Sequence, residues 1–212
     1  MFPAFLDPCV LLKPYLCDTL LSIAEAGVYR PLWSADVTAE LRRNMIRRGL
    51  KDAQVDHRLG QMTVHFPDAE VVGYQDLIPA MTNHPKDQHV LAAAIRGGAD
   101  VLVTENLRDF PDDAVAPYDL RAVHQDEFLL DLLDLWPAMV LDALRRQTSR
   151  YRRTPRTPRD LLETSAPRAA VAPGSPEPAS VSSEGEFGLV QLVCAQLTKL
   201  GPCSQPRGSC TA

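Results

Sequence analysis

The chain has 212 residues, of which 45% are hydrophobic and 23% charged, and its formal net charge at pH 7 is −5. This composition is typical of a globular domain, and the negative charge argues against tight nonspecific binding of nucleic acid by the whole surface, though not against a local basic patch. The five cysteines show neither zinc-ligand spacing nor a disulfide framework, the N-terminus lacks the basic start of a signal peptide, and no run reaches the roughly 18 apolar residues of a membrane span. We therefore expect a cytoplasmic protein with reduced thiols and no membrane segment.

Short apolar strands alternate with amphipathic helices along most of the chain. The sequence predicts strands at residues 2–7, 69–74, 100–104 and 120–124. It predicts helices at residues 11–26, 35–48, 51–66, 86–96, 126–136 and 137–151, and a last short helix that is capped by Thr157 and begins at Pro158. This alternation indicates an α/β protein whose central sheet is largely parallel.

The composition of the chain changes after about Ala166. The stretch "APRAAVAPGSPEPASVSSEGE" is rich in proline, alanine and serine, and it lacks the apolar residues needed to bury a core. We therefore expect a globular domain at residues 1–165 and a mostly disordered tail at residues 166–212.

Acidic side chains lie at or near the ends of several predicted elements. Asp7 ends the first strand, and Asp109 lies a few residues beyond the third. Asp87 opens the helix that leads into that third strand, and Glu40 lies inside the second predicted helix. Ligands of open α/β sheets bind outside the carboxyl ends of the strands. If these four carboxylates converge, their repulsion requires a cation, and Mg²⁺ or Mn²⁺ is the usual ion of an all-oxygen site.

The same acids also have a plain structural interpretation. The chain has 27 acidic residues, so several would lie near strand ends by chance. Asp87 alone suits a charge at a helix terminus, and Glu40 alone suits an exposed helix position. Asp7 is the most informative, because a carboxylate at the end of an apolar strand loses hydration energy unless it has a partner. Spacing alone leaves the two interpretations about equally open.

Three segments, in this order, resemble the PIN-domain ribonucleases, and among these the VapC-type toxins of bacterial type II toxin–antitoxin systems. They are "FLDPCVLL", "PLWSADVTAELRRNM" and "PKDQHVLAAAIRGGADVLVTENLRDFP", of which the last is the most specific. The resemblance covers about residues 2–160. It implies a PIN-like three-layer α/β/α fold with a largely parallel central sheet. It also implies a metal-dependent endoribonuclease, in which water attacks the phosphodiester bond of RNA.

By position, the resemblance also implies roles for the four acids. It implies that Asp7, Asp87 and Asp109 hold Mg²⁺ or Mn²⁺ and that Glu40 completes the catalytic cluster. It implies a cognate antitoxin protein, which inserts a segment near the site, and a homodimer. One departure is Pro8, which stands where the family commonly has a threonine or serine whose hydroxyl supports the site.

Other polar residues are weaker candidates for substrate binding. Thr104 and Asn106 are able to hydrogen-bond a water or the scissile phosphate, or only the backbone of a turn. Arg145 and Arg146 open an arginine-rich run that ends at Arg159. This run suits contact with RNA phosphates or an antitoxin, and equally a solvated helix end. The five histidines show no paired metal-ligand spacing, and we assign them no role.

Two other functions stay open beside the ribonuclease. A PIN-like binding module with a degenerate site would hold a partner or RNA without cleaving it, and Pro8 together with the unusual C-terminal composition favours this alternative. A phosphohydrolase with Asp7 as covalent nucleophile is the least supported. That chemistry generally needs a second aspartate two residues on, where this chain has Cys9.

Overall fold

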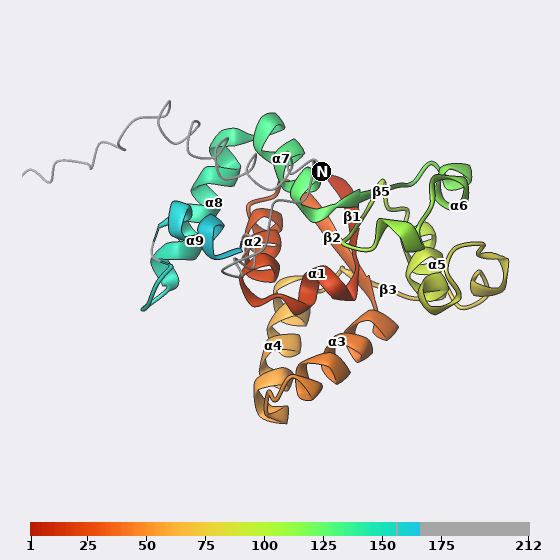
Figure 1. Ribbon diagram of the computed structural model, residues 1–212, viewed down its shortest axis with the longest axis horizontal. Helices are drawn as coiled ribbons and strands as arrows, with labels where there is room; N and C mark the ends of the chain where they lie inside the picture. The colour runs from red at the N-terminus through yellow and green to blue at the C-terminus, as the bar shows by residue number, and fades with distance from the viewer. Residues whose placement is uncertain (156, 166–212) are drawn as a thin grey trace, which may run out of the picture.

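The computed structural model describes residues 1–155 and 157–165 (Figure 1), and the tail predicted at residues 166–212 lies outside the described residues. The centre of the described part is a five-stranded sheet with the order β3-β2-β1-β4-β5, in which every neighbouring pair is parallel. The strands are β1 Phe2–Leu6, β2 Tyr29–Ser34, β3 Glu70–Val71, β4 Val101–Thr104 and β5 Arg121–His124. The predicted α/β class with a parallel sheet is confirmed.

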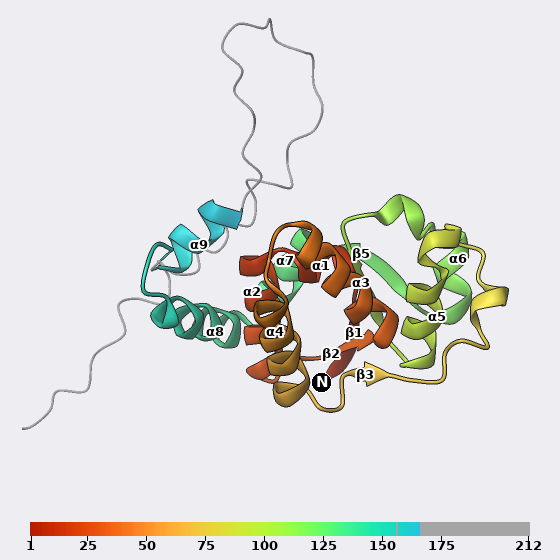
Figure 2. The same cartoon turned by 90° about the horizontal axis from the view of Figure 1, so that it is seen from below.

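Helices cover both faces of this sheet. Helices α2 and α7 lie on one side, and α5 and α6 lie on the other (Figures 1 and 2). The α helices are α1 Pro8–Leu12, α2 Pro14–Glu25, α3 Ala35–Arg47, α4 Asp52–His65, α5 Gln88–Arg96, α6 Asp112–Val115, α7 Gln125–Leu135, α8 Pro137–Arg150 and α9 Pro158–Ser165. Short 3₁₀ turns are η1 Ile78–Ala80, η2 Pro85–Asp87, η3 Leu107–Asp109 and η4 Ala116–Tyr118. This is the three-layer arrangement expected of a PIN-like fold.

The core lies around the two central strands. Phe5 of β1 is paired with Leu32 of β2 on one side and with Leu102 of β4 on the other, and Phe5 and Leu102 have no exposed surface. Strands covered on both faces need apolar side chains at consecutive positions, which explains the uninterrupted apolar runs "FPAFL" and "VLVT". No helix in the described part of the chain is long and apolar enough to cross a membrane.

Several elements differ from the predictions. The strand predicted at residues 69–74 is only the two-residue β3. Strand β2 was not predicted, because Pro31 lies in its middle and proline is unusual in a central strand. Pro31 is opposite Ala4 of β1, and the residues on both sides of it continue the ladder. The helix predicted at residues 11–26 is two helices, because the chain is extended at Lys13 and Pro14 starts α2 as its first residue.

Two helix starts near the C-terminus of the described part are confirmed. Pro137 is the first residue of α8, and Pro158 is the first residue of α9. The Thr157 hydroxyl accepts a hydrogen bond from the backbone N–H of Asp160 at 3.1 Å, and the Asp160 carboxylate accepts one from the Thr157 N–H at 3.2 Å. This reciprocal cap fixes the start of α9.

Helix α5 packs very closely on the sheet at its C-terminal end. A Cβ atom on Gly97 would lie 2.8 Å from Val71 Cγ2 and 3.0 Å from Leu32 Cδ1, so a side chain there would collide with β3 and β2. Gly98, with φ +62, then ends the helix in the left-handed region. This docking sets the position of the whole helix, and with it the residues at its N-terminus.

Candidate metal centre

The predicted acids gather at the carboxyl edge of the sheet. All strands are parallel, so this edge collects the residues that follow each strand. Asp7 follows β1 directly, and Asp109 ends the η3 turn after β4. Helix α5 leads back to the start of β4, so its N-terminus lies at the same edge, where Asp87 ends the η2 turn and is the N-cap of α5. Glu40 comes from α3, which starts where β2 ends.

Asp7 is a buried carboxylate that accepts hydrogen bonds from two donors. Only 5% of its surface is exposed. One oxygen, Oδ2, accepts from the Thr104 hydroxyl at 2.5 Å, and the other, Oδ1, accepts from the Cys9 backbone N–H at 3.3 Å, which makes Asp7 the N-cap of α1. Burial raises the pKa of Asp7, the two hydrogen bonds lower it, and the negative charge of Asp87 raises it further.

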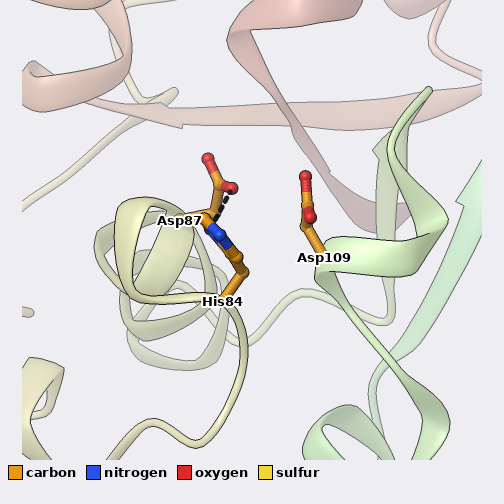
Figure 3. Close-up of side chains that lie close together, drawn as sticks. All are labelled: His84, Asp87 and Asp109. Atoms are coloured by element: carbon orange, nitrogen blue, oxygen red, sulfur yellow. Dashed lines mark ion pairs between the residues drawn. The ribbon is translucent and has the colours of Figure 1, made fainter.

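Asp87 and Asp109 lie together with a residue to which the sequence assigned no role, His84 (Figure 3). One ligand atom from each of these three residues lies within 4.8 Å of the other two. His84 Nδ1 is 3.5 Å from Asp87 Oδ2. Backbone bonds hold the group: the His84 N–H donates to the Asp109 carbonyl at 3.2 Å, and the Asp87 N–H donates to the His84 carbonyl at 2.9 Å.

Asp87 interacts electrostatically with each of the other three predicted acids. Burial raises the pKa of Asp87, and repulsion by Asp109 and Glu40 adds to this effect, while the nearby Lys86 and His84 side chains lower it. Asp87 in turn acts on Asp7. Asp7 and Glu40 are not members of the 4.8 Å group, yet they lie close enough to act on it electrostatically. Glu40 is half-buried on α3 and accepts a 3.4 Å hydrogen bond from Asn44.

The donor set fits a divalent cation. Carboxylate oxygens and an imidazole nitrogen are both metal ligands, and bound cations commonly neutralise clusters of carboxylates that repel one another. Two ligands on opposite sides of an ion with bonds of about 2.1 Å lie about 4.2 Å apart. The 4.8 Å spread of His84, Asp87 and Asp109 is therefore within a small side-chain rotation of a common ion.

Thr104 supports Asp7 and does not face the solvent. It has no exposed surface, its hydroxyl donates to Asp7, and the same oxygen accepts from the Asn106 N–H at 3.0 Å. These contacts favour the structural interpretation of Thr104 over a contact with substrate. This hydroxyl comes from β4, and it supplies the donor that Pro8, the first residue of α1, is unable to give. Asn106 is exposed and stays open to a ligand.

The arginines predicted to bind substrate are on helix α8. Arg145 and Arg146 belong to α8, which lies on the opposite side of the molecule from α5 in both views (Figures 1 and 2). Arg146 forms an ion pair with Asp142 one turn earlier. Contact of these two arginines with a substrate therefore stays a prediction.

His84 is the residue of this group that the sequence analysis missed. It lies three positions before Asp87, in "HPKD", and the η2 turn between them has three residues per turn. In a 3₁₀ turn, side chains three apart lie one above the other. The order histidine, proline, any residue, aspartate is the local signal in the sequence. It could have predicted that His84 and Asp87 lie together.

Two known protein families match separate parts of the chain. The PIN domain family matches residues 4–108, which include Asp7, Glu40 and Asp87. The VapC50 C-terminal domain family matches residues 125–171. Residues 4–108 of the chain thus carry a PIN domain. The similarity of the chain to the VapC-type members, expected from three sequence segments, has support from two separate parts of the chain.

A curated relative of this PIN-domain protein comes from Mycobacterium tuberculosis and carries the name "Putative ribonuclease VapC50". It is 52% identical over 91 residues, which are 43% of this chain and 54% of the relative. The match thus spans about half the length of the relative. No solved structure matches the chain at a significant level.

Proposed function

We propose that this protein is a metal-dependent endoribonuclease and the toxin of a toxin–antitoxin pair. The observation that carries the proposal is the convergence of carboxylates from four separate elements on Asp87 at the carboxyl edge of the sheet. The PIN domain at residues 4–108 and the ribonuclease name of the Mycobacterium tuberculosis relative support it. A purely structural set of acids would not need to place like charges around Asp87, whose pKa is raised partly by Asp109 and Glu40.

In this proposal Asp7, Asp87 and Asp109 hold Mg²⁺ or Mn²⁺, and Glu40 completes the cluster. Such an ion activates a water and stabilises charge on a phosphoryl oxygen. The protein positions the ligands: the donors to Asp7 fix its two oxygens, and the backbone bonds between the η2 and η3 turns fix Asp87 and Asp109. These side chains are bound to rigid elements, so the site is largely formed before RNA binds.

The substrate and partners follow from the same proposal. RNA reaches the cluster at its exposed rim, where Asn106 is open to hydrogen-bond a phosphate or a base. Arg145 and Arg146 would contact only a distant part of a long RNA or of a cognate antitoxin, because α8 lies on the far side. A homodimer and a cytoplasmic location belong to the proposal through the family resemblance.

Cleavage by matched variants tests the proposed site. The wild-type chain, Asp87→Asn and Asp109→Asn would be incubated with a mixed single-stranded RNA pool and with total cellular RNA, in Mg²⁺ and in Mn²⁺. Asp134→Asn is the control, since Asp134 is an exposed carboxylate on α7. We expect the control to cleave RNA at the wild-type rate and both site variants to cleave at least about 100-fold more slowly. Removal of a residue that only surrounds the metal ligands usually has a smaller effect.

Circular dichroism and thermal melting would establish that each variant is folded. Undiminished cleavage by a folded Asp87→Asn would contradict the site. Absence of cleavage by the wild type in both metals and both RNA samples would support the binding module with a degenerate site.

A further inference from the structure

The group around Asp87 contains a nitrogen donor as well as carboxylates. The PIN-like site inferred from the sequence consists of four acids and offers only oxygen. In the structure, the His84 ring lies with Asp87 and Asp109 in the 4.8 Å group, which does not include Asp7 or Glu40 (Figure 3 draws the three members). The chemical question is whether this imidazole takes part in metal binding or only faces the acids as a counter-charge.

The backbone holds His84 in place relative to both acids. Its N–H donates to the carbonyl of Asp109, and its own carbonyl accepts from the N–H of Asp87. Pro85 follows directly and restricts His84 to extended geometry, which is observed with φ −53 and ψ 128. The start of the side chain is thus fixed, and only its two side-chain torsions are left to direct the ring.

We propose that His84 is a ligand of the metal ion in the proposed ribonuclease site and gives this site a preference for a first-row transition ion over Mg²⁺. Mg²⁺ binds oxygen and keeps much of its water, whereas transition ions accept imidazole nitrogen readily. The inference rests on the proposed function, because it needs an ion held by Asp87 and Asp109. It adds a ligand and a metal preference that four carboxylates alone would not provide.

The alternative, in which His84 is only a positive counter-charge, requires a different protonation state of the ring. A ligand nitrogen must carry a free lone pair, so the ring is neutral, whereas a counter-charge must be protonated. His84 Nδ1 lies 3.5 Å from Asp87 Oδ2, beyond the usual length of a charge-assisted hydrogen bond. A ring at that distance leaves room for an ion between nitrogen and carboxylate after a small rotation.

Electron spin echo spectroscopy of the Mn²⁺-loaded full-length protein tests the ligand directly. A bound imidazole gives ¹⁴N modulation of the Mn²⁺ signal, and we expect this modulation in the wild type and its loss in His84→Ala. His57→Ala is the control, because His57 is exposed on α4 and would report only adventitious surface binding. Wild-type protein that binds Mn²⁺ without ¹⁴N modulation would overturn the inference.

Calorimetric titration with Mn²⁺ and with Mg²⁺ measures the preference. We expect His84→Ala to weaken Mn²⁺ binding by about tenfold or more and Mg²⁺ binding by much less, the range seen when residues around a metal are removed. His84→Asp makes the group all-oxygen, so the ratio of Mn²⁺ to Mg²⁺ affinity should fall below that of the wild type. Equal losses for both ions in His84→Ala would contradict the inference, and tighter binding of both ions would instead identify His84 as a positive counter-charge.

Asp87→Asn separates this inference from the proposed function. If Asp87→Asn abolishes binding of both ions while His84→Ala leaves the Mn²⁺ preference intact, only the role of His84 fails. If Asp87→Asn leaves both affinities unchanged, the proposed metal site itself fails. Thermal melting of each variant in EDTA would show that the metal-free proteins remain folded.

Discussion

Thr104 and Asp7 together show how single residues make this site possible. A buried carboxylate is costly unless its oxygens accept hydrogen bonds. Asp7 has such bonds from the Thr104 hydroxyl and the Cys9 N–H. Pro8 alone gave reason to doubt the site, because the family's supporting hydroxyl is missing there. Thr104 on the neighbouring strand β4 provides a hydroxyl in its place. The linear sequence does not show this, because the contact depends on the pairing of β1 with β4.

Thr104→Val should therefore lower both stability and metal affinity. The change keeps the shape of the side chain but leaves Asp7 with one donor fewer and the Asn106 N–H without its acceptor. We expect the free energy of unfolding to fall by about 1–3 kcal/mol, the cost of unsatisfied buried polar groups. Urea unfolding in EDTA measures the fall, and Mn²⁺ titration measures the affinity. Thr104→Ser retains the hydroxyl, so a serine variant as weak as the valine variant would argue against this role.

At the scale of elements, the position of α5 depends on its C-terminal glycines. Gly97 allows contact with β2 and β3, and this contact places the helix so that Asp87 reaches the acidic edge. Sequence alone predicted this helix and the strand after it, because their apolar patterns and the Gly-Gly stop are local signals. It did not predict β2, where Pro31 obscured the pattern and only pairing with β1 defines the strand.

Gly97→Ala should destabilise the protein, because the new methyl group would collide with Val71 and Leu32. We expect a loss of about 1–3 kcal/mol, as for other overpacked sites. Gly60→Ala is the matched control: Gly60 lies inside α4, and a methyl group added there would meet nothing within 4 Å, so alanine should stabilise by about 0.5–1 kcal/mol. Thermal and urea unfolding compare the two, and a neutral Gly97→Ala would contradict the tight packing.

His124 at the start of α7 makes the stability of this element depend on pH. Its Nδ1 accepts from the Asp126 N–H at 3.4 Å when neutral, and when protonated it pairs with the Asp126 carboxylate at 3.4 Å. The hydrogen bond with Asp126 raises the pKa of His124 above its ordinary value of 6.5. A raised folded-state pKa adds stability that is complete below the unfolded pKa and is lost as the pH rises through the folded pKa.

The wild type should therefore exceed Asp126→Asn in stability by a larger margin at pH 5.5 than at pH 8.5. Both side chains are about one-third exposed, so the difference between the two margins should be only about 0.2–1 kcal/mol. Thermal melts at the two pH values measure it. A margin that is equal at both values, or larger at pH 8.5, would contradict the ion pair.

At the scale of the whole molecule, the sequence predicted the fold class and the edge where the acids meet. Parallel strands place their carboxyl ends together, so acids after strands one and four converge whatever their separation in the chain. It did not predict the pairing of His84 with Asp87, because this pairing depends on a 3₁₀ turn. It also did not predict that α8, which carries Arg145, lies on the opposite side of the molecule from α5, because the path of α8 depends on packing. The domain boundary at residue 165 stays a prediction.

Binding of an ion at this edge should stabilise the whole domain. A ligand that binds only the folded state at 100 times its Kd adds about 2.7 kcal/mol. We therefore expect saturating Mn²⁺ to raise the Tm of the wild type relative to EDTA and to leave the Tm of Asp87→Asn unchanged. The Asp134→Asn control should behave like the wild type. An equal rise in all three proteins would indicate nonspecific binding to surface acids.

Removal and return of the metal test the central claim most directly. Purified wild-type protein would be treated with EDTA, dialysed and mixed with total cellular RNA, before and after Mn²⁺ is added back. We predict no cleavage without metal and defined RNA fragments once Mn²⁺ returns. Cleavage that persists in EDTA, or RNA that stays intact when folded protein has Mn²⁺ bound, would contradict a metal-dependent ribonuclease at this site.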